Sequence, residues 1–557
     1  MINLIRIISC FLVFHNCIGQ TFIPTENSRL NFTQVLFKTE EIAGASSYLF
    51  ILEEIEDSTL KLEQWDSTHV TIIERLDFGR NYRWYAEAYS GNGELLKKSR
   101  MHSFTIASTE RVDEKSYQFV ILKNEVAKRE DGIIFLDKNT VAINRQGQVV
   151  WYLPFNEGER RNERLRDLKM TQEGTITYLA PNEGVEVSVE NAVIWKSPNN
   201  GIVSGDSVEY YHHEFTKLPN GNYLTLGKLF EDWNLTINDQ VIKKIPFTVV
   251  IEYNALGDTL WTWSSRNYFK ESDILNTGEH IFLGDSYGHA NSVIQSEDGK
   301  LIYLGFRDLN TVLVIDKQLR KVVNSYGDKI NADSTLSSFG FFKKQHAAVP
   351  FDSNKIVVFN NNLNTASSVL VFTETDEKSQ LSQKIWEFVC DFDTLMPSYS
   401  EKMGNVQVLK NGNFLVNMGS VARLFEVTNN NEVVWNCLPQ KWNRELSIWQ
   451  PITNYRINYQ RSLYPKYFSV SLRKDSNNND YFLIQNEGSE NDSYTVSFSM
   501  QGKKVKDEVK LYIPSDNGEK VYVKDYFSEK QRKKEITIRV ISNSNSRQVY
   551  ERKMNFQ

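Results

Sequence analysis

Cysteine is scarce in this chain, which limits the covalent and metal chemistry open to it. The 557 residues include 4 cysteines, and Cys10 and Cys17 lie near the start of the chain. Only Cys390 and Cys437 would remain after removal of a leader. Each follows a tryptophan near the end of a repeated segment, so a disulfide between neighbouring repeats and two free buried thiols both remain open.

An excess of positive charge is also missing. The formal net charge is −6 at pH 7, and lysine and arginine are scattered along the chain. This composition argues against a nucleic-acid-binding surface. The oligomeric state is left open, with a homodimer among the alternatives.

Long apolar runs are absent after the N-terminus. Residues 1–20 contain Arg6, an apolar run over 7–14 and then small or polar residues, which is the layout of a secretory signal peptide. Neither early cysteine follows a convincing lipobox, so we expect export without lipidation, to the periplasm or outside the cell. No other segment reaches ~18 apolar residues, so no membrane span is expected in the mature protein.

A helical period is absent from residues 116–440, and a strand repeat takes its place. Six segments each end in a β-branched run after a turn, usually with a tryptophan: VVWYL (149–153), VIWKS (193–197), TLWTW (259–263), VVNSY (322–326), KIWEF (384–388) and VVWNC (433–437). Short strands separated by turns such as Asn220-Gly221 and Asn411-Gly412 precede these endings. The pattern predicts an all-β protein with a six-bladed β-propeller over residues 108–450.

The flanking segments have a different strand pattern. Residues 21–107 alternate around Tyr82, Trp84 and Ala86, which is typical of a fibronectin type III-like β-sandwich. Residues 455–557 carry short strands with polar turns and predict a second sandwich.

Histidines recur at matching places in three successive repeats. They stand in YHHEFTKLPNGNYLTL (211–226), GHANSVIQSEDGKLIYL (288–304) and KQHAAVPFDSNKIVVF (344–359). The sixth repeat has Gly404 and Asn405 at this place. Because equivalent positions converge around a propeller axis, we expect His212 or His213, His289 and His346 to meet at one mouth of the channel.

Other polar residues accompany these histidines. Arg307 follows the second strand of its repeat and could present a guanidinium fork to an oxyanion. Asn291 shares the inward parity of its strand, while Gln345 and Glu214 adjoin the histidines. His280 falls in an expected loop and is interpreted as structural.

The residue types leave several chemistries open. No carboxylate pair suggests a retaining glycosidase, and no strand-G-x-S-x-G-helix context suggests a serine hydrolase. Three imidazoles could hold zinc with an open coordination site, as in a metal-dependent hydrolase or lyase. A neutral imidazole could instead attack a phosphoryl or sulfuryl group, and a non-catalytic propeller could bind sulfated or anionic ligands through the same side chains.

Four motifs in order resemble bacterial aryl-sulfate sulfotransferases: HHEFTKLPNGNYL, HANSV followed by GFR and VLVID, QHAAV, and NVQVLKNGNFLVNMGS followed by VVW. The resemblance covers roughly residues 116–440. It implies a six-bladed propeller enzyme with an N-terminal sandwich, exported to the periplasm. We expect no cofactor and no metal. The implied reaction is ping-pong transfer of a sulfuryl group from an aryl sulfate to a phenol, without the nucleotide sulfate donor, through a sulfohistidine.

The resemblance also assigns roles to residues. It makes His346 of QHAAV the nucleophile, supported by His289, Asn291, Arg307 and His213. His212 and Asn405 are further supporting candidates. Glu214 stands where aspartate is common, and the C-terminal sandwich exceeds the minimal family architecture, which leaves the acceptor substrate open.

Overall fold

The computed structural model describes residues 21–57, 61–74, 76–154, 165–237, 239–277, 286–328, 340–374, 382–505 and 507–556. The signal-peptide prediction and His280 therefore lie outside the described residues. The chain divides into two compact units. One comprises residues 110–171 and 175–460, and the other contains the described residues up to 109, residues 172–174 and those from 461 onward.

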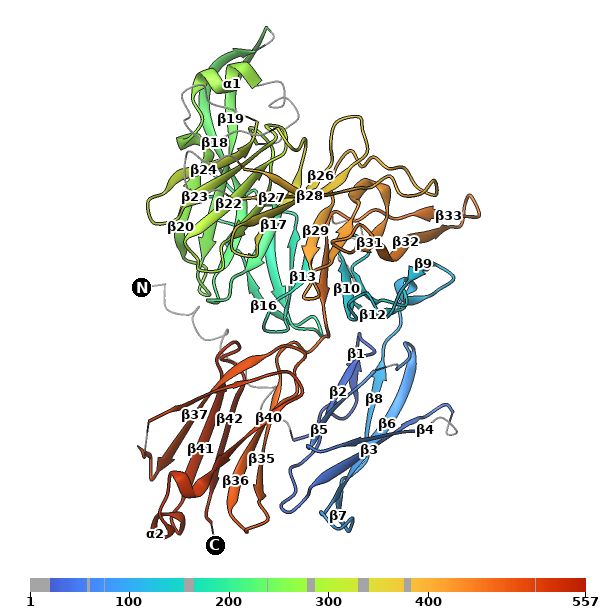
Figure 1. Ribbon diagram of the computed structural model, residues 1–557, viewed down its shortest axis with the longest axis vertical. Helices are drawn as coiled ribbons and strands as arrows, with labels where there is room; N and C mark the ends of the chain where they lie inside the picture. The colour runs from blue at the N-terminus through green and yellow to red at the C-terminus, as the bar shows by residue number, and fades with distance from the viewer. Residues whose placement is uncertain are drawn as a thin grey trace, which may run out of the picture. The chain divides into compact units, whose positions relative to one another are not determined.

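The first unit is built from six antiparallel sheets, each with a core of four strands (Figure 1). From the inner strand outward, the first blade contains β34 (Ile457–Gln460), β10 (Ile133–Leu136), β11 (Val141–Asn144) and β12 (Val149–Tyr152), and the second contains β13 (Arg166–Met170), β14 (Ile176–Ala180), β15 (Glu183–Val187) and β16 (Val193–Lys196). The third blade contains β17 (His212–Lys217), β18 (Tyr223–Ile237), β19 (Gln240–Tyr253) and β20 (Thr259–Ser264), and the fourth contains β21 (Ala290–Gln295), β22 (Leu301–Phe306), β23 (Thr311–Asp316) and β24 (Lys321–Gly327). The fifth blade contains β25 (His346–Phe351), β26 (Lys355–Asn360), β27 (Ser368–Thr373) and β28 (Lys384–Val389), and the sixth contains β29 (Asn405–Val408), β30 (Phe414–Asn417), β31 (Leu424–Val427) and β32 (Val433–Asn443).

The inner strands contact one another in a closed cycle. β34 contacts β13, and contacts then follow between β13 and β17, β17 and β21, β21 and β25, β25 and β29, and β29 and β34. This cycle confirms the predicted six-bladed propeller. The sixth sheet also pairs with β9 (Tyr117–Asn124) and β33 (Ile448–Pro451), and a short helix, α1 (Glu271–Thr277), follows the third.

The tryptophans that end the repeats join neighbouring blades. Their indole N–H groups donate to backbone oxygens of the next blade, from Trp151 to Val189 at 2.8 Å and from Trp261 to Lys317 at 2.9 Å. The indole of Trp435, in the last blade, donates to the Arg145 oxygen of the first at 2.8 Å. A buried indole N–H needs an acceptor, so these bonds fix how adjacent blades pack.

The ring is closed by a strand from beyond the expected propeller. Ile457 to Gln460 pair with Leu136 to Ile133 to complete the first sheet. The propeller unit therefore extends to residue 460, and the C-terminal sandwich begins after it and not at residue 455. Turn and strand signals could not separate these neighbours, because a strand of four residues carries no signal of the sheet that it joins.

The second unit contains two β-sandwich modules. In the N-terminal module, one sheet holds β1 (Ser28–Leu30), β8 (His102–Ile106), β6 (Arg80–Tyr89), β3 (Ser47–Glu54), β4 (Lys61–Asp66) and β7 (Leu95–Lys98), and the other holds β2 (Val35–Lys38) and β5 (Val70–Ile73). Phe37 of β2 packs edge-on against Trp84 of β6, with ring centroids 5.2 Å apart, so the sheets share a core.

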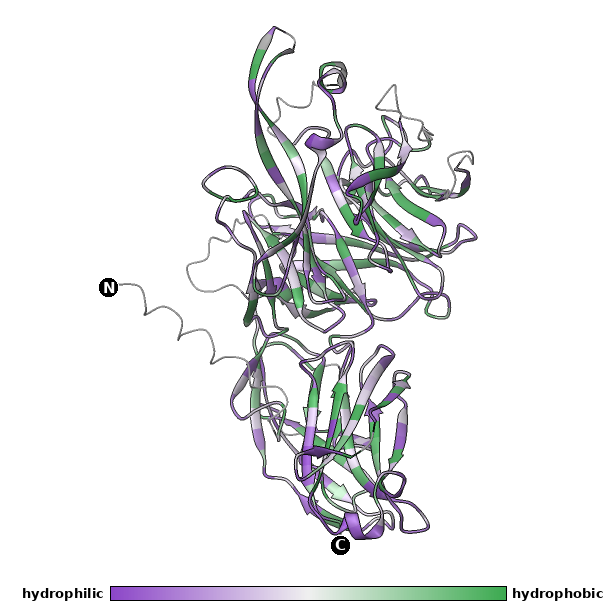
Figure 2. Cartoon of the chain, turned by 90° about the vertical axis from the view of Figure 1, so that its left-hand side faces the viewer, coloured by the Kyte–Doolittle hydropathy of each residue, from purple (hydrophilic) through white to green (hydrophobic). Residues whose placement is uncertain are grey.

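The C-terminal module also has two sheets. One contains β35 (Phe468–Lys474), β36 (Asp480–Asn486) and β40 (Gly518–Tyr522), and the other contains β38 (Lys503–Lys504), β37 (Asp492–Met500), β41 (Ile536–Ser542), β42 (Val549–Met554) and β39 (Val509–Ile513). Helix α2 (Glu529–Arg532) precedes β41. Figure 2 shows apolar segments gathered along the strands, while the loops are mainly polar.

Cys390 and Cys437 are free and buried. Burial raises the pKa of both thiols, so they remain protonated at neutral pH. Within the described ranges, no helix is long and apolar enough to cross a bilayer.

Candidate active site

A bulge shapes the start of several inner strands. The pairing register skips after His212 in β17 and after His346 in β25. The same skip follows Arg166 in β13, so these three residues occupy corresponding positions in their blades. The residues after the three, Asp167, His213 and Ala347, have φ values of 56°, 64° and 51°. A bulge redirects side chains locally, which explains how paired histidines leave one strand in different directions.

Three histidines from two blades form a hydrogen-bonded chain. His212 Nδ1 lies 2.7 Å from His213 Nδ1, and His213 Nε2 lies 3.2 Å from His289 Nε2. His212 Nε2 lies 3.3 Å from the backbone oxygen of Gly227. One end of this chain is therefore a backbone carbonyl group, which can only accept a hydrogen bond.

That carbonyl orders the protons along the chain. His212 must donate from Nε2, so its Nδ1 accepts from His213 Nδ1–H, and His213 Nε2 then accepts from His289 Nε2–H. The carboxylate of Asp308 lies 3.6 Å from the remaining nitrogen, His289 Nδ1. A proton placed on His289 Nδ1 therefore faces a negative charge.

His213 is held in the neutral form. Burial lowers the pKa of His213 well below its usual value, and the neighbouring His212, His289, Arg166 and His346 lower it further. A neutral ring is what the ordered chain requires, because His213 both donates and accepts.

His346 lies in a separate environment made by the fifth blade. Its Nδ1 lies 2.6 Å from Asn361 Oδ1, and the Asn361 amide donates to the backbone oxygens of Ser400 at 2.9 Å and Met403 at 3.0 Å. Since the Asn361 amide group is used in those two bonds, its oxygen must accept from His346 Nδ1–H. The Nε2 lone pair then faces a single long contact, the Met403 N–H at 3.3 Å.

The His346 ring is also neutral. Burial lowers its pKa to about 3; the bond to Asn361 raises it, and the charges of Arg307, His289 and Arg456 lower it. An imidazole with Nδ1–H fixed and Nε2 unprotonated is a nucleophile ready to attack.

Arg307 lies beside the two histidine groups. It donates to Asp308 Oδ1 at 2.6 Å and to the backbone oxygen of Glu401 at 3.1 Å. Lys344 Nζ also contacts Asp308 Oδ1, at 3.0 Å. Although burial acts to raise the pKa of Asp308, His289, Lys344 and Arg307 together hold it below its usual value. The Asp308 carboxylate thus connects the arginine with the end of the histidine chain.

Two of the expected site residues act as braces. Asn291 is fully buried, and its amide donates to the backbone oxygen of Gln345 at 2.8 Å, which ties β21 to the residue before His346. Asn405 donates to the Ile457 oxygen at 2.9 Å and accepts from the Ile457 N–H at 3.0 Å. The structure therefore gives Asn405 the role of joining the last blade to the closing strand β34.

A buried charge network lies behind the histidines. Glu214 pairs with Lys169 at 2.9 Å and with Arg456, while Asp167 pairs with Lys169 at 2.7 Å. Burial and the neighbouring Glu214 raise the pKa of Asp167 to about 6, while Arg456 and Lys169 outweigh burial and lower that of Glu214. The network holds Glu214 away from substrate chemistry and makes it an anchor between blades.

Sequence reasoning missed Tyr455 and Arg166. The Tyr455 ring lies 5.7 Å from His213 and 6.3 Å from His346, measured between centroids, and its hydroxyl donates to the Asn291 oxygen at 3.2 Å. The Arg166 guanidinium lies 5.5 Å from the Tyr455 ring centroid. Its position matches His212 and His346 in register, and this correspondence was the signal that could have identified it.

Metal binding has no support in the described geometry. Among the residues that the structure describes, no group of three or more histidine, cysteine, aspartate or glutamate side chains could hold a metal ion. Both ring nitrogens of His213 instead lie within hydrogen-bonding distance of other imidazoles.

Comparison with known families gives the site its context. A family model described as arylsulfotransferase (ASST) matches residues 108–450, which includes all the histidines of the site and ends before the closing strand β34. The chain belongs to the arylsulfotransferase family. Membership supports aryl sulfotransferase activity in general and small-molecule substrates. No curated protein matches the chain.

Solved structures resemble the chain only distantly. A protein of unknown function from Bacteroides caccae is 13% identical, with 62% of this chain and 99% of that chain covered and a TM-score of 0.37. Kuenenia stuttgartiensis hydrazine synthase is 10% identical over 54% of this chain and 99% of that chain, with a TM-score of 0.29. Likenesses at this level carry no argument about function.

Proposed function

We propose that this protein transfers a sulfuryl group from an aryl sulfate ester to a phenolic acceptor through a covalent sulfohistidine at His346. The observation that carries the proposal is the buried, neutral His346 ring, whose Nδ1–H is fixed by Asn361. Burial usually penalises a charged ring, so His346 can attack at neutral pH without first losing a proton.

In the first half-reaction, the Nε2 lone pair of His346 forms a bond to sulfur while the bond from sulfur to the ester oxygen breaks. The leaving phenolate takes a proton from His289, which must enter this step as an imidazolium, with its second proton on Nδ1 opposite Asp308 at 3.6 Å, and is left neutral. Arg307 supplies positive charge toward the sulfuryl oxygens, where negative charge is concentrated in the transition state.

In the second half-reaction, a phenol gives its proton back to the site and its oxygen attacks the same sulfur. The sulfur–nitrogen bond breaks and returns neutral His346. Because one site serves both half-reactions, the donor phenol must leave before the acceptor enters, which is a ping-pong order.

Intact-mass analysis tests the covalent step. Incubation with 4-nitrophenyl sulfate and no acceptor should add about 80 Da, one SO₃ group, to the wild-type protein. The adduct should be absent in His346→Ala and present in His289→Ala, since 4-nitrophenolate leaves without a proton. Equal masses for wild type and His346→Ala would overturn the proposal.

The same variants test the two other functions left open by the residue types. Turnover that a chelator abolishes and zinc restores would indicate a metal-dependent enzyme. Binding of aryl sulfate with neither turnover nor adduct would indicate a binding module.

A further inference from the structure

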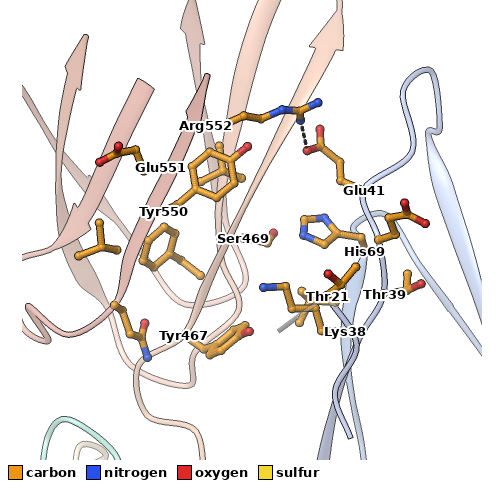
Figure 3. Close-up of a pocket in the computed structure, with 16 residues that line it drawn as sticks. Thr21, Lys38, Thr39, Glu41, His69, Tyr467, Ser469, Tyr550, Glu551 and Arg552 are labelled. Carbon is orange, nitrogen blue, oxygen red and sulfur yellow. Dashed lines mark hydrogen bonds and ion pairs between the residues drawn. The ribbon is translucent and has the colours of Figure 1, made fainter. Parts of the chain in front are cut away.

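A cavity lies between the two sandwich modules of the second unit, outside the propeller. Its volume is about 330 Å³, and the lining comes from β2 and β5 of the N-terminal module and from β35 and β42 of the C-terminal module (Figure 3). Its size falls at the lower end of the range, about 300–1,000 Å³, of small-molecule sites. Nothing in the sulfuryl-transfer mechanism uses it.

The N-terminal module contributes an imidazole with unused hydrogen-bonding capacity. His69 is only 5% exposed, and its Nδ1 is buried without a hydrogen-bond partner among the described residues. Figure 3 shows its ring extending from the N-terminal module toward Ser469 and Tyr550. Burial, followed by the charges of Lys38, Arg473 and Arg552, lowers the pKa of His69 to about 3. An unpaired polar atom in a buried neutral ring is costly at a purely structural position.

Charges around the cavity nearly balance. Lys38 and Arg552 are the lining cations, and Glu40, Glu41 and Glu551 are the lining carboxylates. Arg552 pairs with Glu41, which also accepts from the Leu472 N–H at 2.7 Å. Glu40 pairs with Lys97 at 2.7 Å and Glu551 with Arg539 at 3.7 Å, so each lining carboxylate already has a counter-charge. This balance favours a neutral ligand over a charged one, while the ion pair and His69 disfavour a purely apolar one.

Aromatic side chains also contribute to the lining of the cavity. Tyr467, Phe468 and Tyr550 line the cavity and are half-buried. A ligand that suits this lining offers hydroxyls that both donate and accept, together with C–H groups that pack on aromatic rings.

We propose that this cavity binds a neutral saccharide unit, with Tyr550 as a packing surface and His69 and the Glu41–Arg552 pair as hydrogen-bonding partners. None of its lining residues takes part in the proposed sulfuryl transfer, and its existence does not depend on that activity.

Saturation-transfer NMR and calorimetry on the full chain test the proposal with D-glucose, D-galactose, D-mannose, N-acetylglucosamine and maltose, and with inorganic sulfate as the anionic comparison. At least one sugar should bind with a millimolar or lower Kd, and sulfate should neither bind there nor compete. Tyr550→Ala should weaken binding at least tenfold, whereas Tyr512→Ala should leave it unchanged, because Tyr512 is 63% exposed on the same module and does not line the cavity.

A second variant keeps the test valid if Tyr550→Ala misfolds. Thr21 is an exposed lining residue, so Thr21→Trp should obstruct the cavity without removing a buried contact. Binding lost in Thr21→Trp, with an unchanged melting temperature, supports the site. Failure of every sugar to bind, sulfate binding in their place, or unchanged sugar affinity in both lining variants would overturn it.

Discussion

The two sides of the propeller site hold neutral histidines by different means. On the fifth blade, His346 is fixed by one amide, Asn361, that is itself locked to two backbone oxygens. On the third and fourth blades, His213 is fixed by other imidazoles in a chain that ends at Asp308. An amide cannot take or give a proton at neutral pH, whereas an imidazole chain can.

This difference separates the expected roles. The side of the site where Asn361 binds His346, here called the amide side, keeps one tautomer of His346 through the whole cycle, which suits a nucleophile. The side that contains the chain of three histidines is here called the chain side. A proton on His289 Nδ1 there would face the Asp308 carboxylate, which suits proton transfer to and from the phenol. The following substitutions exchange or remove these features.

Replacing His346 should have the largest effect. His346→Gln should lower kcat by about 10⁴-fold or more for good and poor leaving groups alike, because no group remains to form the bond to sulfur. His213→Gln should cost about 10²-fold, the range of a proton-transfer contribution. Steady-state assays with 4-nitrophenyl sulfate and with an unactivated phenyl sulfate measure both. Equal losses in the two variants would remove the distinction between the two sides.

Asn361→Asp should convert the amide side into a charged one. A carboxylate at the present 2.6 Å contact would stabilise protonated His346 and raise its pKa from about 3. The acid limb of the pH–rate profile should then move to higher pH. At pH values below the new limb, kcat should fall by about 10²-fold. Asn361→Gln is the uncharged control. Matching pH profiles for the Asp and Gln variants would show that His346 is not the titrating nucleophile.

Much of the fold was predictable from sequence, because strand and turn signals recur in every blade. The repeat endings identified β12, β16, β20, β24, β28 and β32. Convergence of the histidine-bearing strands follows from the closed ring. The closing strand β34 was assigned to the sandwich, because one short strand carries no signal of the sheet that it joins.

The site itself was less predictable, since its partners come from side-chain contacts across blades. The tautomer of His346 depends on Asn361, which follows β26 and is held by loop oxygens at Ser400 and Met403. Arg166 stands at the histidine position of a blade with little sequence likeness to the others. Tyr455 lies just before the closing strand, and no spacing within the repeat places it near His213.

Asp308→Asn should weaken the chain side selectively. Without the negative charge facing His289 Nδ1 at 3.6 Å, a proton at that nitrogen loses its counter-charge, so proton transfer to a poor leaving group should become less efficient. We expect kcat to fall by about tenfold or more with phenyl sulfate, whose phenolate is a poor leaving group, and to change little with 4-nitrophenyl sulfate. Asp308 also binds Arg307 and Lys344, so an equal loss with both substrates would point to a purely structural role.

A further difference between the two sides should appear in the free energy of unfolding. The pKa of His346 is about 3 in the folded protein, against about 6.5 for an unperturbed histidine, so the unfolded chain binds a proton that the folded chain does not. The ring's contribution is therefore fully present above pH 6.5 and is lost as the pH falls toward 3. Within this window, the unfolding free energy of wild type should fall more steeply than that of His346→Gln, by about 1.4 kcal/mol per pH unit at most. Denaturant unfolding at several pH values measures the difference. Parallel curves for the two proteins would show that the folded site accepts a proton on His346, which would remove the physical basis for a permanently neutral nucleophile on the amide side.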